Sequence, residues 1–418
     1  MTSTKHNAVE QNNLSEVKEL VRNGADINVR DINGNKPIHL AAQLGRNNII
    51  EFLLSKGASV DEVKNNDTTP LHCAARFGQL GTIKFLISKG ANINFKDRIG
   101  GKKPIHSAII GGHKDVVEFL LSKGESVNDA DEIGRTTLHY AASENKLEVA
   151  KFLIDKGANI YANDTCGQKP IHLAAYAGHI NIIDLFLSKG VSIENTDKNG
   201  LTPLHYAAQF GHLRLAEFLI NKGANIHAKT IKGKKPIHLA AHGGYKTANA
   251  ANIIKCFLSR GVNVNDTNTN GLTPLHYAAK HAKLEAVKLL IDEGADIHAK
   301  TVGGQKPIHL AARGGGCTTP HVIELFLNKG ISINEIDANG LTPLHYTAGV
   351  DGYFKEITAK FLINRGANTQ VKDNNGKTPL DLARETGRMG VASMLSTTKV
   401  TDVSLHQHSA SSKFLSRV

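Results

Sequence analysis

Histidine gives this chain its clearest capacity for chemistry, because imidazole binds transition metals and transfers protons near neutral pH. The chain has 21 histidines, and ten of them recur in one motif: His39, His72, His106, His139, His172, His205, His238, His276, His309 and His345. Successive motif histidines lie a whole repeat apart and cannot converge on one ion. The close pair His406 and His408 has no Cys or carboxylate companion, so we expect no metal site.

Nucleophilic and cofactor chemistry is not indicated either. The sequence has no phosphate-binding loop, dinucleotide glycine fingerprint, HExxH or GxSxG motif, so we expect neither catalysis nor a cofactor. The cysteines are far apart and form no CxxC pair, which favours reduced thiols: Cys73, Cys166, Cys256 and Cys317. Cys73 occupies a helix position equivalent to Leu40 or Tyr206, and we expect it to pack in the core.

The net charge and the targeting signals that a sequence can carry limit which class of partner and which cellular compartment we expect. The net charge of +12 favours an acidic partner, but Lys and Arg are scattered with no run of five, so we expect a protein and not nucleic acid. Residues 1–13 lack the apolar core of a signal peptide, and no stretch reaches the ~20 apolar residues that span a bilayer. We expect a cytoplasmic protein without a transmembrane segment. Secretion by a leaderless or specialised route is the alternative.

Short repeated helices must position all of these residues. The motif proline recurs 33 to 38 residues apart, with Thr137 in one matching slot, at positions 37, 70, 104, 170, 203, 236, 274, 307, 343 and 379. In Thr202-Pro203-Leu204-His205, Thr is a good helix N-cap and Pro fits the first helical position. Paired alanines allow close packing, and glycines such as Gly178 end this first helix. A second helix follows with apolar residues at helical spacing.

This motif resembles the signature of the ankyrin-repeat family over residues 5–398. The resemblance implies an all-α fold: an ankyrin-repeat solenoid of about twelve helix-turn-helix units joined by β-hairpin loops, curved and elongated. We divide the chain into an N-terminal capping repeat, ten repeats with insertions in the seventh, ninth and tenth, a C-terminal capping repeat and a flexible tail. These are residues 1–34, 35–376, 377–398 and 399–418.

A second period of two repeats overlies the first. The N-cap alternates between Thr and Lys, and the Lys positions are Lys36, Lys103, Lys169, Lys235 and Lys306. Most Thr repeats also place Tyr after the motif His. The alternation is explained by tandem copying of an ancestral pair, or by a ladder of positive charges that meets an acidic partner. Because Lys cannot cap a helix as Thr does, we expect Thr at all five positions to raise the melting temperature.

In the ankyrin family, partners usually dock against the first helices and the hairpin tips. By position, this resemblance implies helix residues Leu44, Arg76, Phe77, Ile110, Tyr176, Gln209, Phe210, Lys280, His281 and Arg313, of which we select Arg76, Phe77, Ile110, Tyr176, Phe210 and Lys280. The tips supply Arg98, Lys102, Lys229, Lys232, Lys234 and Lys300. The insertions at 242–252, 314–320 and 349–354 lie between paired helices and are interpreted as drift or as a binding edge.

The sequence therefore predicts a monomeric, non-enzymatic adaptor or scaffold that binds protein. Two alternatives remain. The Lys and Thr alternation is similar to the ankyrin arrays of latrotoxins and of secreted bacterial effectors, although a latrotoxin-type N-terminal region is missing here. The chain is also compatible with a substrate-recognition subunit of a larger complex.

Overall fold

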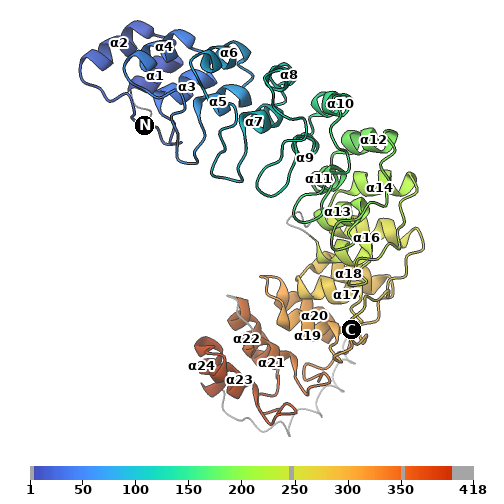
Figure 1. Ribbon diagram of the computed structural model, residues 1–418. Coiled ribbons are helices and arrows are strands. Elements are labelled where there is room, and N and C mark those ends of the chain that lie inside the picture. Colours follow the sequence, from blue (N-terminus) through green and yellow to red (C-terminus); the bar gives the residue numbers. More distant parts are fainter. Residues whose placement is uncertain (1–3, 244–248, 350–353, 398–418) are drawn as a thin grey trace, which may run out of the picture. The chain divides into compact units, whose positions relative to one another are not determined.

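The computed structural model describes residues 4–243, 249–349 and 354–397, and within them the chain is all-α, as predicted. Twenty-four helices follow one another as twelve pairs (Figure 1). Their bounds are α1 Thr4–Glu10, α2 Leu14–Arg22, α3 Pro37–Gln43, α4 Asn47–Ser55, α5 Pro70–Arg76, α6 Leu80–Ser88, α7 Pro104–Gly111, α8 Lys114–Ser122, α9 Thr137–Ser143, α10 Leu147–Asp155, α11 Pro170–Ala177, α12 Ile180–Ser188, α13 Pro203–Phe210, α14 Leu213–Asn221, α15 Pro236–His242, α16 Ala250–Leu258, α17 Pro274–Lys280, α18 Leu284–Asp292, α19 Pro307–Arg313, α20 Thr319–Asn328, α21 Pro343–Ala348, α22 Phe354–Asn364, α23 Pro379–Glu385 and α24 Met389–Thr397.

The described residues form two compact units. The first contains the chain up to Pro236 together with Asn249, and the second contains residues 237–243 and the chain from Ala250 onward. Some of the predicted features lie outside the described residues: the tail 399–418 with His406 and His408, and parts of two insertions, at 244–248 and 350–353. The ninth-repeat insertion is described and lies between α19 and α20.

The first helix of each repeat begins directly after the N-cap residue of the motif. The hydrogen-bonding needs of the helix N-terminus explain which residues the motif contains. Thr69 adopts an extended conformation, Pro70 is the first helical residue, and the Thr69 side chain accepts a hydrogen bond from the backbone N–H of His72. Four orphan N–H groups at a helix start need such partners, because a buried unpaired donor costs free energy. Gly178 ends α11 with φ of 84°, a left-handed conformation that glycine adopts without strain.

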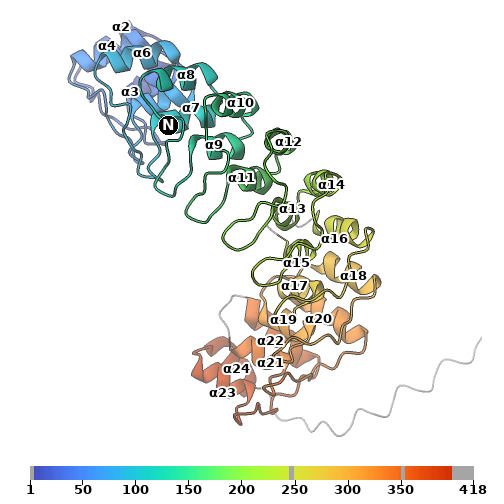
Figure 2. The same ribbon diagram turned by 45° about the vertical axis from the view of Figure 1, so that its right-hand side comes forward.

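The hydrophobic core lies between the two helices of each pair and between neighbouring pairs. Within the first unit, Figure 2 shows α9, α11 and α13 on the side of the connecting loops and α10, α12 and α14 on the opposite side. Ile182, Ile183 and Phe186 of α12 are fully buried, and so are Ala174 and Ala175 of α11. The small alanines let adjacent first helices approach closely, as the motif predicts.

The connecting loops are tight reversals organised by a carboxylate. In one of them, a single Asp131 oxygen accepts hydrogen bonds from the backbone N–H groups of Ile133 and Arg135, at 3.0 and 2.8 Å. Neighbouring loops are joined by backbone hydrogen bonds, such as Thr165 to Ile133 at 2.9 Å and Ile231 to Asn199 at 3.0 Å. The predicted β-hairpin loops therefore take this form, and the described residues contain one isolated bridge, between Ala130 and Thr136.

The motif histidines tie each first helix to a loop further along the chain. In a Thr repeat, the Nδ1 atom of His205 accepts from the backbone N–H of Thr202, at 3.1 Å, so its Nε2–H donates to the Lys234 carbonyl at 3.1 Å. In a Lys repeat, His172 donates to the Asn195 carbonyl at 2.9 Å. The acceptor lies 29 residues ahead in the first case, just before the next motif, and 23 ahead in the second, at the end of the same repeat. The alternation thus extends to the histidine hydrogen bonds, and those of the Thr repeats reach the next repeat.

A second set of bonds between repeats starts from the second helices. His113, His179 and His212 each precede a second helix and donate to the last turn of the preceding repeat's first helix. Their acceptors are the carbonyls of Arg76, Ser143 and Tyr176, at 3.0, 3.0 and 2.8 Å. In the second unit, buried Lys355 donates to the Ala312 carbonyl at 2.8 Å. These donors satisfy helix C-termini that would otherwise be buried without partners.

The motif histidines predict a loss of stability in mild acid. Burial lowers the pKa of His39, His72 and His276 to about 4, from 6.5 for a free side chain. The unfolded chain therefore binds more protons than the folded chain between pH 6.5 and 4, and stability falls as the pH falls through this range. Each such histidine contributes up to about 1.4 kcal/mol per pH unit. We expect Tm, measured by circular dichroism, to fall steadily from pH 7 to pH 5.

A matched pair of variants tests the assignment to the motif histidines. His72→Asn should lower Tm at pH 7 and reduce the slope of Tm against pH. His298→Gln, which changes an exposed loop histidine, should leave the slope unchanged. A Tm that is constant between pH 7 and pH 5 would show that these imidazoles do not control stability.

Candidate functional site

The residues predicted to bind a partner lie on first helices or loops and fall into separate groups. Arg76, Phe77, Ile110 and Lys102 line one hollow of the first unit, and the Arg98 backbone N–H bonds to the loop beside it. Tyr176 and Phe210 pair with each other, and three lysines share one loop: Lys229, Lys232 and Lys234. Lys280 and Lys300 belong to the second unit. The structure thus gives these residues local groupings, and their role in binding stays a prediction.

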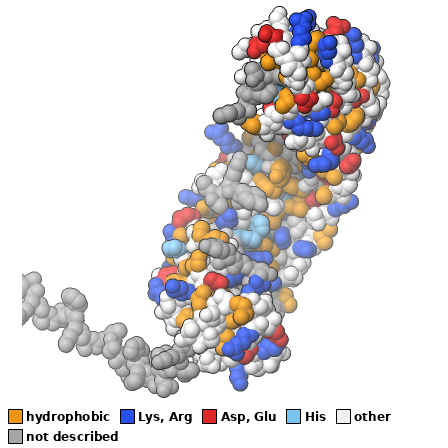
Figure 3. Space-filling view, turned by 90° about the vertical axis from the view of Figure 1, so that its left-hand side faces the viewer, with side chains coloured by type: hydrophobic (Ala, Val, Ile, Leu, Met, Phe, Trp, Pro, Cys, Tyr) orange, Lys and Arg blue, Asp and Glu red, His pale blue; other side chains and the backbone are white. Residues whose placement is uncertain are grey.

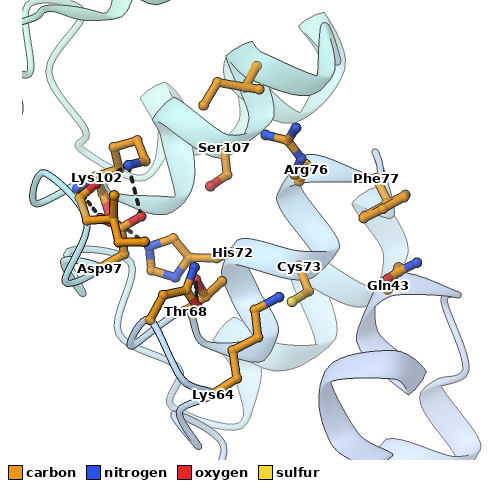
Figure 4. A pocket seen from close by; sticks show the side chains of 13 residues that line it. Gln43, Lys64, Thr68, His72, Cys73, Arg76, Phe77, Asp97, Lys102 and Ser107 are labelled. Atoms are coloured by element: carbon orange, nitrogen blue, oxygen red, sulfur yellow. Dashed lines mark hydrogen bonds and ion pairs between the residues drawn. The ribbon is translucent and has the colours of Figure 1, made fainter. Parts of the chain in front are cut away.

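The hollow, which we call the Cys73 hollow, lies beside α3, α5 and α7 and encloses about 250 Å³ (Figure 4). Thirteen residues line it: Gln43, Lys64, Asn66, Thr68, His72, Cys73, Arg76, Phe77, Asp97, Ile99, Lys102, Ser107 and Ile110. Its floor is formed by Cys73, which is 5% exposed as predicted for a core position, and by Ser107, which is 8% exposed. Phe77 stands at its edge with 48% of its surface exposed.

The charges around the Cys73 hollow are mostly positive. Asp97 forms an ion pair with Lys102 at 3.2 Å, and this pair leaves little net charge. Lys64 donates to the neutral side chain of Asn35 at 3.0 Å, and no described residue forms an ion pair with the exposed Arg76 guanidinium. His72 is buried and neutral, because burial lowers its pKa to about 4. The hollow therefore favours an anionic group near Lys64 and Arg76.

An aromatic cluster lies two repeats further along the chain. The rings of Tyr176 and Phe210 have centroids 4.3 Å apart, and Phe210 stacks on Tyr206 at 6.4 Å. The contact explains why large side chains occupy these positions, yet Tyr176 keeps 50% of its surface exposed. Tyr206 itself is buried and donates from its hydroxyl to Asp197 at 2.9 Å. The cluster therefore contains a buried ring, Tyr206, and a half-exposed ring, Tyr176, that a partner could contact.

Exposed aliphatic side chains at the loop tips are a feature that the sequence reasoning missed. Ile32, Ile99, Ile231 and Val302 are 80%, 62%, 73% and 82% exposed, and all four precede a Lys repeat. Each follows the Asp or Thr that organises its loop. The sequence shows that these four residues recur before Lys36, Lys103, Lys235 and Lys306. The exposure of their side chains depends on the loop conformation, which the sequence pattern does not give.

Four lysines of the proposed ladder form ion pairs or hydrogen bonds with other groups of the same chain. Lys36 pairs with Glu62, Lys306 with Glu335 at 2.7 Å, and Lys103 with Glu125 and Asp129, at 3.3 and 3.1 Å. Lys169 donates to the Thr196 carbonyl at 3.1 Å. In every one of these cases the acceptor lies 22 to 29 residues further along the chain, in the loop between the second helix of the same repeat and the next first helix.

The interpretation of the ladder as a surface for an acidic partner is therefore wrong for these four residues. Their side chains are buried or half-buried, with Lys306 only 9% exposed, and their charges are already neutralised or hydrogen-bonded. Where Lys replaces the Thr cap, its side chain bonds instead to the loop that follows the second helix of the same repeat.

The remaining surface charge is mixed. On the face shown in Figure 3, Lys and Arg side chains are interspersed with acidic and uncharged ones and do not gather in one patch. Metal binding has no structural support in the described part of the chain, which contains no group of three or more His, Cys, Asp or Glu residues that could hold an ion. No helix among the described residues is long and apolar enough to cross a membrane.

The fold and these surfaces define a helical repeat protein whose units are joined by a buried histidine network and whose loops and first helices carry exposed apolar groups. The chain belongs to the ankyrin-repeat family. The family model for ankyrin repeats in three copies matches it at residues 5–97, 95–164, 158–230, 227–301 and 308–405. Ankyrin repeats are generally protein–protein interaction modules and are typically non-enzymatic.

Two further similarities are local or partial. An ankyrin repeat protein of fowlpox virus (strain NVSL) is 42% identical over 50 residues, which are 12% of this chain and 35% of the viral protein. The chain thus matches about a third of that relative's length. The crystal structure of the human ASB11 ankyrin repeat domain is 25% identical and aligns with a TM-score of 0.45, covering 53% of this chain and 99% of that domain.

Lys103→Thr should destabilise the protein, although Thr is the better helix cap. The substitution leaves Glu125 buried without its cation, and breaking a buried ion pair costs up to about 3–5 kcal/mol. The loss is smaller if Glu125 takes up a proton, since burial raises the pKa of this carboxyl to about 7. We expect a lower Tm, which reverses the sequence-based expectation. Lys151→Thr, in an exposed pair with Glu148, is the control and should leave Tm nearly unchanged, because solvent screens such a pair. An increase in Tm for Lys103→Thr would contradict the account.

Thiol reactivity should separate the four cysteines. Burial raises the pKa of the Cys73 thiol to about 11, so almost no thiolate is present at pH 8, and Cys256 is also buried. Cys166 and Cys317 are exposed. Iodoacetamide at pH 8 should modify these two in the folded protein, as measured by peptide mass spectrometry, and urea should release the other two. Equal modification of Cys73 and Cys166 in the folded state would show that α5 packs differently.

Proposed function

We propose that this protein is a non-enzymatic adaptor or scaffold that binds another protein on the surface formed by its first helices and loop tips. The observation that carries the proposal is the placement of uncovered apolar groups. Of the eleven large hydrophobic side chains exposed among the described residues, eight lie on this surface: Ile32, Phe77, Ile99, Ile133, Tyr176, Ile231, Val302 and Ile336. Large apolar groups gathered on one kind of surface are a feature of binding sites, and aromatic residues such as Phe77 and Tyr176 are enriched at protein interfaces.

The loops present these groups in a fixed arrangement. Backbone hydrogen bonds join neighbouring tips, as from Arg98 to Asn66 and from Val302 to Asn270, both at 3.0 Å. A surface that is ordered before binding loses less conformational entropy when a partner docks, so more of the contact energy is available for affinity.

The charge of the loops favours a partner with an acidic surface. Lys229, Lys232 and Lys300 are exposed at or beside the tips that carry Ile231 and Val302. Exposed lysines of this kind accelerate encounter with an acidic protein and add modest affinity. We further propose that the protein acts as a monomer in the cytoplasm, where its four free thiols are compatible with reducing conditions.

The toxin or secreted-effector alternative rests on the two-repeat alternation and on the 50-residue likeness to a viral ankyrin repeat protein. The alternation is accompanied by different hydrogen bonds in the Lys and Thr repeats, which gives it a role within the fold. A substrate-recognition role has no observation of its own in the described residues. We therefore argue for the adaptor.

Alanine at Phe77, Tyr176 and Phe210 tests the proposed surface. Partners captured by the full-length chain should be lost, or bound at least about tenfold more weakly, because interface aromatics contribute 2 kcal/mol or more. The measurement is quantitative affinity purification with mass spectrometry, followed by titration of each recovered partner. The control is Ile357→Ala with Met389→Ala, which removes exposed apolar groups from the second helices α22 and α24. Full retention of partners by the triple variant would mean that another face binds them.

A further inference from the structure

The repeat that holds the Cys73 hollow departs from its sister repeats at the position after the motif His and at the loop position nine residues earlier. In the sister site around α13, Tyr206 follows the motif His, its hydroxyl donates to Asp197 at 2.9 Å, and Gln168 donates to that hydroxyl at 2.6 Å. The Tyr206 ring also contacts the preceding motif histidine, His172, with centroids 5.7 Å apart. A phenol thus fills the space between loop and helix.

Around α5 the same three positions are changed. Cys73 stands in place of the tyrosine, Lys64 in place of the loop aspartate nine residues earlier, and Asn35 in place of the glutamine. Lys64 now bonds directly to Asn35 at 3.0 Å. The loop is therefore closed without a phenol, and the volume of the missing ring is open next to Cys73.

The next first helix adds to the opening. Ser107 of α7 occupies the position after the motif His where the other Lys repeats of the first unit carry Leu40 and Leu173. Two adjacent positions thus lose large side chains at once. The hollow of about 250 Å³ opens to solvent and is lined by both apolar and polar side chains, so it is suited to accepting a side chain from outside.

The charge at the loop position of the hollow is also opposite in sign to the charge at the sister sites around α9 and α13. Where Tyr140 and Tyr206 meet Asp131 and Asp197, a ring in the Cys73 hollow would meet the cation of Lys64. Figure 4 shows Lys64 reaching toward Cys73, with Arg76 and Phe77 on the α5 side of the hollow. Phe77 corresponds to Phe210, which stacks on the ring of Tyr206, so a ring in the hollow would contact the exposed face of Phe77.

We propose that the Cys73 hollow is a recognition pocket for one aromatic side chain in an acidic segment of a partner protein. The ring takes the place next to Cys73 that tyrosine fills in the sister repeats, between Lys64, Cys73 and Phe77. Carboxylates that flank the ring bind Lys64 and Arg76. This inference rests on the proposed function and narrows it to one partner chemistry at one place on the surface.

The experiment uses the full chain and a labelled peptide, Ser-Glu-Glu-Asp-Tyr-Asp-Glu-Glu-Ser, in fluorescence polarisation at low salt. Four further peptides carry Phe, Leu, Ala or Ser in the centre. The wild-type protein should bind the Tyr and Phe peptides about tenfold more tightly than the Ala and Ser peptides, as expected for a buried aromatic anchor.

The decisive variant restores the sister residues: Lys64→Asp with Cys73→Tyr and Ser107→Leu. Because these residues fill the same positions elsewhere in this chain, the variant should fold with an unchanged or higher Tm and should lose the preference for a central aromatic. Lys64→Gln should weaken the binding of all five peptides, and less so as salt is raised. Lys329→Gln removes an exposed charge at the end of α20 and should leave every affinity unchanged.

The outcomes distinguish this inference from the proposed function. The pocket is refuted if the wild-type protein shows no preference for the central residue of the peptide, or no measurable binding. It is also refuted if the preference is unchanged in the refilled variant, which carries the three sister residues. Capture of partners that is lost with the Phe77, Tyr176 and Phe210 alanines but kept by the refilled variant leaves the proposed surface standing and the pocket refuted. Capture that is insensitive to those alanines refutes the surface itself.

Discussion

A neutral, buried imidazole that bonds in two directions is the constraint on which this array depends. Its Nδ1 accepts the backbone N–H of the N-cap residue, which puts the proton on Nε2, and in a Thr repeat Nε2 then donates to a carbonyl of the following repeat, as His72 does to Lys102 at 2.9 Å. One side chain therefore caps a helix and joins two repeats. Because each unit is too small to bury its apolar face alone, stability comes from such contacts between neighbours.

The alternation between Thr and Lys repeats is a second solution to the same constraint. Where Thr is the N-cap, its hydroxyl forms a further hydrogen bond with the Nδ1 atom of the motif histidine, as between Thr202 and His205 at 2.9 Å. Where Lys replaces it, the side chain extends forward to an acidic residue in the loop at the end of its own repeat, as from Lys306 to Glu335. The histidine acceptor also shifts, from a residue just before the next motif to one earlier in the loop. Both forms satisfy the same backbone groups with different partners.

The helices, their order and the family could be predicted from the sequence because one period and one motif control them. The role of the Lys positions could not, because their acidic partners lie 22 to 29 residues away and are not part of the motif. The Cys73 hollow was missed for a related reason. Cys73 alone looks like a core residue, and only its combination with Lys64 and Ser107 shows that a space has been left open. Exposure of Tyr176 and Ile231 likewise depends on packing that a single repeat does not encode.

The forward reach of the lysines has a consequence for how such a chain can change in length. Each lysine and the carboxylate or carbonyl that receives its ammonium group lie within one repeat, before the next motif begins. The histidine bond that does cross a repeat boundary, from His72 to Lys102, ends on a backbone carbonyl, which every residue provides. Removal or duplication of a single repeat therefore leaves none of these lysines without its partner.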